Sequence, residues 1–137
     1  DREKAVIFNP QKITGFEGDT GPYIEYTRAR ITSILEKSSI EADKSPLYWT
    51  MLTNSERRLA RTALILEDSI DNSLQSDKPH FVARSLLLLA NEFNSYYASN
   101  RIIGSGNEKS KIRFLKKFRD YIDKGLNLLG MPLLDKV

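Results

Sequence analysis

The stretch FEGDTGPYIEYTRARI, residues 16–31, decides the first part of the fold, because a glycine-rich turn leads directly into a helix. The glycines let the backbone take a positive φ or pass close to a neighbour, so a β-branched residue at Gly21 should be disruptive. Asp19 and Thr20 are both good helix caps, and Pro22 suits a first helical turn. The turn therefore predicts a helix over 22–37. Residues that recur at helical spacing along it are Tyr23, Tyr26, Thr27, Arg30, Ile31 and Ile34.

Apolar stripes at helical spacing predict three further helices, over 53–74, 79–100 and 109–129. A capping box formed by Thr53 and Glu56 opens the first of them. Asp77 and Pro79 are expected to cap and open the second. Gly130 follows the third in the position where helices commonly stop.

These elements predict an all-α fold, an antiparallel helical bundle of about four long helices with a glycine-rich loop before the first. Residues 1–14, which include a short β-like run, are expected to be a linker or the end of an upstream region. Residues 15–137 would form one helical domain. Trp49 lies in the polar loop between the first two helices, where we expect it to anchor that loop to the core.

Composition is ordinary for a soluble globular protein, with 28% charged residues and 40% hydrophobic residues. No apolar run approaches the ~20 residues of a membrane span, and no leader-like segment opens the chain, so we expect neither membrane insertion nor secretion. The absence of cysteine excludes disulfides and thiol chemistry. The net charge is only +3, but the basic residues cluster. One cluster runs over 109–124, and another comprises Arg57, Arg58 and Arg61. Each cluster is typical of a surface that binds a polyanion, but each is also compatible with an ordinary solvated helix face.

The opening stretch closely resembles the signature at which the catalytic domain of arginyl-tRNA synthetases meets their C-terminal anticodon-binding domain, of the DALR type. Glu25 stands where glutamine is usual, and Arg28 where histidine is common. The runs FNSYY at 93–97 and KGLNLLG at 124–130 resemble two further elements of that domain. The last residues differ from the family pattern, because Pro132 is displaced and Val137 stands where the family has a terminal methionine.

This resemblance implies a module that binds the anticodon arm of arginine tRNA without performing chemistry. All arginine codons have a central guanine, so it also implies a pocket for the central cytosine of the anticodon. An upstream class I catalytic domain would use ATP and magnesium, whereas this chain would need no cofactor. A cytoplasmic monomer is expected. The alternative from the residues alone is a helical protein-interaction module that presents a basic face to an acidic partner.

Reading an anticodon requires flat side chains for unpaired bases, polar groups for their edges, and cations for phosphates. Tyr26 and Tyr97 are the candidate stacking platforms, and Asn94 is the candidate edge reader. The candidate tRNA-binding residues are Tyr26, Arg30, Asn94, Tyr97, Arg101, Lys116 and Lys117.

Several of these residues also have a purely structural interpretation. Helical register points Tyr97 inward, whereas the resemblance places it at the anticodon loop. Asn94 is equally suited to buttressing a neighbouring backbone. Arg28 and Arg30 could simply form ion pairs with Glu25 or Asp19.

Catalytic signals are missing from the chain. His80 is its only histidine and is expected to be a surface or capping residue. No spacing of histidine, cysteine or carboxylate residues matches a zinc site. The glycine-rich turn lacks the ending of a phosphate-binding loop, and neither class I synthetase signature motif is present. Glu17 and Asp19 lie two positions apart in the same turn and nothing in the sequence supplies a cleft, which makes a paired-carboxylate hydrolase a poor interpretation.

Overall fold

The structure is a computed structural model that describes residues 10, 18, 20–39 and 46–135. Most of the predicted linker and of the glycine-rich turn therefore lies outside the described residues, as does Val137. Within them the chain forms four long helices and a short 3-10 turn, and no strand, so the predicted all-α class is confirmed. The elements are α2 (Gly21–Lys37), η1 (Trp49–Met51), α3 (Asn54–Ser76), α4 (His80–Ser99) and α5 (Glu108–Leu128).

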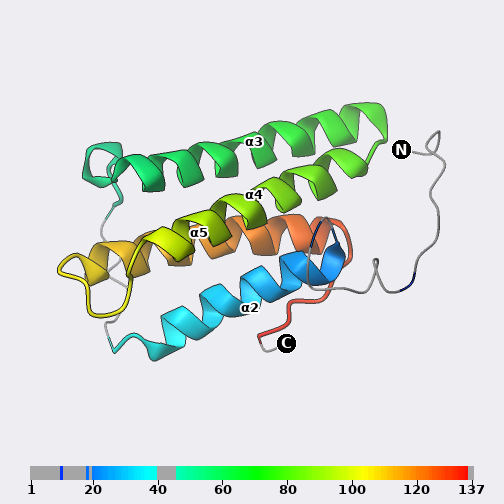
Figure 1. The fold of residues 1–137 in the computed structure, drawn as a ribbon. Coiled ribbons are helices and arrows are strands. Elements are labelled where there is room, and N and C mark those ends of the chain that lie inside the picture. The colour runs from blue at the N-terminus through cyan, green and yellow to red at the C-terminus, as the bar shows by residue number, and fades with distance from the viewer. Residues whose placement is uncertain (1–9, 11–17, 19, 40–45, 136–137) are drawn as a thin grey trace.

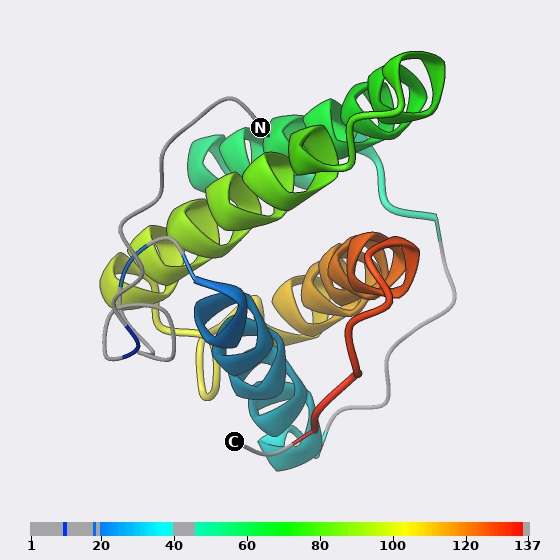
Figure 2. The same ribbon diagram turned by 90° about the vertical axis from the view of Figure 1, so that its right-hand side faces the viewer.

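The helices form two layers, with the α3/α4 pair packed over the α2/α5 pair (Figures 1 and 2). Successive helices run in opposite directions along the bundle, as predicted. Helix α2 packs against α4 and α5 and lies on the far side of the bundle from α3. This arrangement leaves one side of α2 open toward the C-terminal end of α4.

The start of α2 follows from its sequence, with one correction. Thr20 is the cap, and its hydroxyl accepts a hydrogen bond from the amide of Tyr23 at 3.3 Å. Gly21 does not have a positive φ; it is the first residue of the helix. A Cβ at this position would lie 3.1 Å from Cε of Met131, so the glycine allows the C-terminal segment to approach α2 closely.

Two of the three other predicted helix boundaries are confirmed. The capping box of Thr53 and Glu56 opens α3, and Gly130 has a φ of +68° after the end of α5. Asp77 does not cap α4 as predicted. It ends α3 in the left-handed conformation, and Pro79 precedes α4 without a side-chain cap.

The core lies between the layers and is built from the apolar stripes of all four helices. Leu86 and Leu126 are fully buried there, together with Phe93. Gly125 brings α5 close to α4, because a Cβ there would lie 2.7 Å from Cδ2 of Leu86. The close approach of α4 and α5 at this crossing therefore depends on the absence of a side chain at position 125.

The apolar stripe of α4 continues through Tyr96 and not through Tyr97, which corrects the inward placement of Tyr97. Tyr96 is 4% exposed, and its hydroxyl donates to a carboxylate oxygen of buried Glu56 at 3.3 Å. Tyr97 is 41% exposed. Helical spacing alone leaves Tyr96 and Tyr97 on either edge of the apolar stripe, and the hydrogen bond to Glu56 of α3 holds Tyr96 on the buried side.

The loop between α2 and α3 is held by residues other than Trp49, which is 43% exposed. The expectation that Trp49 anchors this loop is therefore wrong. Leu52 is buried and Leu47 packs partly buried against the core, so these two aliphatic side chains hold the described part of the loop instead.

Arg28 fixes the C-terminal segment to α2. It is buried, and it forms ion pairs with Asp123 at 2.7 Å and Asp135 at 2.8 Å and donates to the carbonyl of Leu134. Burial alone would lower the pKa of Arg28, but the hydrogen bonds to both carboxylates raise it above its ordinary value. Among the described residues, its carboxylate partners come from α5 and the C-terminal segment and not from its own helix.

Candidate nucleic-acid interface

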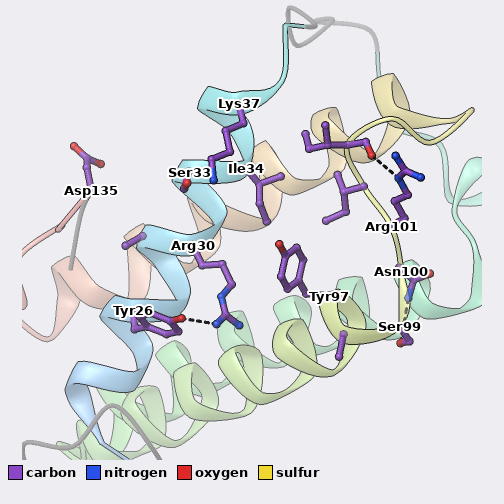
Figure 3. A pocket seen from close by; sticks show the side chains of 14 residues that line it. Tyr26, Arg30, Ser33, Ile34, Lys37, Tyr97, Ser99, Asn100, Arg101 and Asp135 are labelled. Atoms are coloured by element: carbon purple, nitrogen blue, oxygen red, sulfur yellow. Dashed lines mark hydrogen bonds between the residues drawn. The ribbon is translucent and has the colours of Figure 1, made fainter.

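An open groove of about 1090 Å³ lies between α2, the C-terminal end of α4 and the segment that follows it (Figure 3). Four of the seven predicted tRNA-binding residues line this groove, namely Tyr26, Arg30, Tyr97 and Arg101. Up to 75 positions separate them in the sequence. The groove therefore gathers aromatic and cationic side chains from two helices and a connecting segment.

Arg30 lies at the centre of this groove and is held from several sides. Its guanidinium donates to the hydroxyl of Tyr26 at 2.5 Å and to Oδ1 of Asn94 at 2.6 Å. It also lies 4.6 Å from the ring centre of Tyr26 and 5.5 Å from that of Tyr97. Figure 3 shows the guanidinium between the two rings. These contacts fix a positive charge between two flat surfaces before any ligand binds.

Asn94 does not line the groove but supports Arg30, which does. Its amide nitrogen donates to the hydroxyls of Tyr23 and Thr27, both at 3.0 Å, while its oxygen accepts from Arg30. Both sides of the amide are thus engaged within the chain. This geometry favours the interpretation of Asn94 as a buttress over that of an edge reader.

Tyr97 projects from α4 across the groove toward α2 (Figure 3). Its ring stacks on the buried Phe93 with ring centres 6.0 Å apart and planes at 17°. Since 41% of the residue remains exposed, Phe93 fixes the ring's orientation while part of its surface stays accessible to a ligand.

The far rim of the groove carries Arg101 and is braced by α5. The ammonium group of buried Lys111 donates to the carbonyl of Arg101 at 2.5 Å. Glu108 accepts from the amide of Gly104 at 2.6 Å and from the hydroxyl of Ser38 at 2.8 Å, and these two hydrogen bonds hold the pKa of its carboxyl below the ordinary value. The exposed Arg101 side chain is thereby presented from a fixed backbone.

Lys116 and Lys117 are not brought to the groove. Both are exposed on α5 and neither lines the groove, so their contact with phosphate remains a prediction. Another member of the basic cluster over 109–124, Lys124, forms an ion pair with Glu67 of α3 at 2.6 Å.

Ten other residues line the groove, and none of them was predicted as a tRNA-binding residue; Ser33, Lys37 and Asp135 are among them. Ser33 and Lys37 lie three and seven positions after Arg30, so helical spacing alone could have placed them on the same face. Asp135 had no such signal. It reaches the groove because Arg28 holds the C-terminal segment against α2.

His80 lies in the first turn of α4, where its ring is 4.4 Å from that of Phe81. Within residues 10, 18, 20–39 and 46–135, no group of three histidine, cysteine or carboxylate side chains is arranged to hold a metal ion. None of the helices described is both long and apolar enough to cross a bilayer.

Comparison with known families gives a match over most of the chain, since the model of the DALR anticodon binding domain covers residues 24–137. Curated relatives agree. An arginine–tRNA ligase of Oenococcus oeni is 38% identical over 133 residues, which are 96% of this chain and 23% of that protein. An arginine–tRNA ligase of Buchnera aphidicola is 34% identical over 140 residues, with 100% and 24% covered. The chain thus spans about a quarter of the length of the curated relatives it matches.

Solved structures show the same fold. The arginyl-tRNA synthetase of Thermus thermophilus superposes with a TM-score of 0.79 at 30% identity, over 90% of this chain and 22% of that one. A putative arginyl-tRNA synthetase from Campylobacter jejuni gives a TM-score of 0.77 at 25% identity, over 88% and 28%.

Proposed function

Because the chain belongs to the DALR anticodon-binding domain family, we propose that the groove between α2 and α4 binds the anticodon loop of arginine tRNA. The observation that carries this proposal is the position of the Arg30 guanidinium between the rings of Tyr26 and Tyr97. An unpaired base needs a flat surface to stack on and donors for its edge, and this arrangement offers both within one groove.

Arg30 is the residue we assign to the central cytosine of the anticodon. A guanidinium has five N–H groups, of which Asn94 and Tyr26 take two, and in the described part of the chain the other three are left for a ligand. O2 and N3 of cytosine are both acceptors that such a fork can reach together. Uracil carries a hydrogen on N3, so it would lose one of these bonds.

The cations around the groove would hold the sugar-phosphate backbone. Lys37 and Arg101 line opposite parts of it, and Lys116 and Lys117 would extend the contact along α5. Phosphate contacts of this kind position the RNA and add salt-dependent affinity without reading its sequence.

The intact protein is proposed to be an ATP- and magnesium-dependent arginine–tRNA ligase, with its chemistry in a catalytic domain outside this chain. Residues 15–137 would be its anticodon-binding domain, non-catalytic in isolation, and residues 1–14 the connection to the upstream region. We expect a monomeric, cytoplasmic enzyme.

A competition titration tests the proposed function. A labelled anticodon stem-loop of arginine tRNA is bound to the chain and displaced with unlabelled stem-loops of arginine tRNA or of an unrelated tRNA. The arginine stem-loop should compete at concentrations at least about tenfold lower. Equal competition would contradict the proposal. Displacement by a polyglutamate peptide as effective as that by the arginine stem-loop would favour the basic protein-interaction module instead.

A further inference from the structure

A second aromatic and basic surface lies outside the groove, at the start of α3. It consists of Trp49, Arg57 and Arg61, here called the Trp49 platform. The guanidinium carbons of Arg57 and Arg61 lie 6.0 Å and 5.6 Å from the centre of the indole ring. Both distances are at the outer limit of a cation–π contact, so the two cations are close to the ring without being tightly stacked on it.

The side chain of Trp49 is exposed, and it is not among the side chains that hold its loop to the core. Leu47 and Leu52 hold the loop to the core, and Nε of Arg57 donates to the carbonyl of Trp49 at 3.3 Å, which ties η1 to α3. The neighbouring Tyr48 and Met51 are each 55% exposed. Large side chains gathered on the surface in this way are typical of an interaction site.

The charge of the platform indicates an anionic partner. In the described residues neither Arg57 nor Arg61 forms an ion pair, whereas Arg58 between them pairs with Glu92 at 2.6 Å. The two arginines beside the indole therefore keep their charge available, while the arginine on the adjacent face is neutralised within the fold.

We propose that the Trp49 platform is a second RNA-binding site, which takes one unpaired nucleotide of single-stranded RNA. The base would stack on the indole, and Arg57 and Arg61 would bind the flanking phosphates. An acidic peptide would satisfy the arginines but would leave the exposed indole without a flat partner, which is why RNA is the better match.

The platform lies at the same end of the bundle as the groove. Figure 1 shows η1, the connection between α4 and α5, and the C-terminal end of α2 together at that end. The inference does not depend on the anticodon assignment, because it uses neither Arg30 nor Tyr97.

Trp49 is the only tryptophan of the chain, so its fluorescence reports on this site directly. The probe is a hexamer of adenosine nucleotides, compared with an abasic hexamer of the same charge. Stacking should quench Trp49 with the adenosine hexamer and not with the abasic one. Equal quenching by both, or no change with either, would overturn the proposal.

Variants locate the site. Trp49→Leu removes the reporter, so its binding is measured by the fluorescence anisotropy of an end-labelled adenosine hexamer, and it should be weaker than that of the wild type by about 5- to 150-fold, the range expected for one stacked base. The melting temperature should be unchanged, because Trp49 is not a core residue. Arg57→Ala with Arg61→Ala should lower the salt dependence of quenching by about 1.4 units of slope, for two phosphates of a single strand. Arg84→Ala, an exposed arginine near the opposite end of α4, is the matched control and should change neither quantity.

The Tyr97→Ala variant separates this inference from the proposed function. Quenching of Trp49 should persist in it, even where affinity for the arginine stem-loop is lost. If quenching disappears in Tyr97→Ala, Trp49 only senses occupation of the groove and the second site is refuted. If quenching persists while the wild-type chain does not prefer the arginine stem-loop, the anticodon assignment fails and the platform stands.

Discussion

Arg30 depends on Asn94 and Tyr26 for its position, and Asn94 also makes further hydrogen bonds to α2. Asn94 joins α4 to α2 through Tyr23 and Thr27, so the hydrogen bonds that orient the guanidinium also hold the two walls of the groove together. At the scale of single residues, recognition and packing are therefore coupled on one side of the groove. On the other side, Tyr97 is exposed and contributes little to that network.

Tyr97→Ala should lower the affinity for the arginine anticodon stem-loop by ~1–3 kcal/mol, because one stacking surface is removed. Tyr97→Phe should retain most of the affinity, since stacking needs the ring and not the hydroxyl. Titrations together with melting curves of both variants check this. A Tyr97→Ala protein that is destabilised yet binds normally while folded would remove Tyr97 from the site.

The sequence could identify Tyr97 as a candidate but could not orient it. Tyr96 and Tyr97 are adjacent, and periodicity along α4 leaves both near the edge of its apolar stripe. The choice was made by Glu56 of α3, which accepts a hydrogen bond from Tyr96 and lies 40 positions away in the sequence. For Arg28 the sequence offered Glu25 or Asp19 as possible partners, whereas the partners that the structure shows, Asp123 and Asp135, come from α5 and the C-terminal segment.

Helix boundaries were largely predictable, because caps are local. Thr20, the capping box of Thr53 and Glu56, and Gly130 each act within one turn of the helix they bound. Asp77 was assigned to the wrong helix because it lies only two residues before Pro79, and an aspartate there suits either the end of one helix or the start of the next.

At the crossing of α4 and α5, Gly125→Ala should lower the free energy of unfolding by about 1–2 kcal/mol. The added methyl group would overlap the side chain of Leu86, which is fully buried, and we expect the cost of moving it to outweigh the better helix propensity of alanine. Chemical denaturation measures the effect. Gly106→Ala is the matched control, because nothing lies within 4 Å of its added Cβ. A Gly125→Ala variant at least as stable as the wild type would show that the helices do not need this contact.

The contact between α3 and α4 through Tyr96 should make the fold sensitive to alkali. Burial, and then the charge and hydrogen bond of Glu56, raise the pKa of Tyr96 above its ordinary value near 10. Below that pH the hydroxyl is neutral in both states and its contribution to stability is complete. As the pH rises further, the unfolded chain ionises first and this contribution is lost.

Denaturation of the wild type and of Tyr96→Phe at increasing pH tests this behaviour. Tyr96→Phe should be less stable by ~1–2 kcal/mol near neutral pH, because Glu56 loses a partner, and its stability should fall less steeply above pH ~10. Parallel pH profiles for the two proteins would show that Tyr96 does not titrate differently in the folded state.

The groove belongs to the whole molecule, since α2, the end of α4 and the segment near Asp135 form it together. Sequence spacing predicted several of its side chains, yet it could not show that Arg101 lies across from Lys37 or that Lys116 and Lys117 lie elsewhere. Those relations depend on how the two helical layers cross, and that is set by long-range contacts such as the one between Gly125 and Leu86.

Replacing Lys116 and Lys117 with alanine should weaken binding about equally for different tRNA species, because phosphate contacts carry no sequence information. The salt dependence should also fall by up to about two units of slope if both touch phosphate. Affinities across a salt series measure both effects. A loss of affinity at unchanged slope would mean that α5 does not act through its charge.

The affinity ratio between two stem-loops tests the central claim most directly. One is the anticodon stem-loop of arginine tRNA, and the other differs only in a uracil at the central anticodon position. If Arg30 reads the central base in the groove, the cytosine form should bind the wild-type chain about 5- to 150-fold more tightly, a difference of ~1–3 kcal/mol. Equal affinity for the two stem-loops would contradict the account.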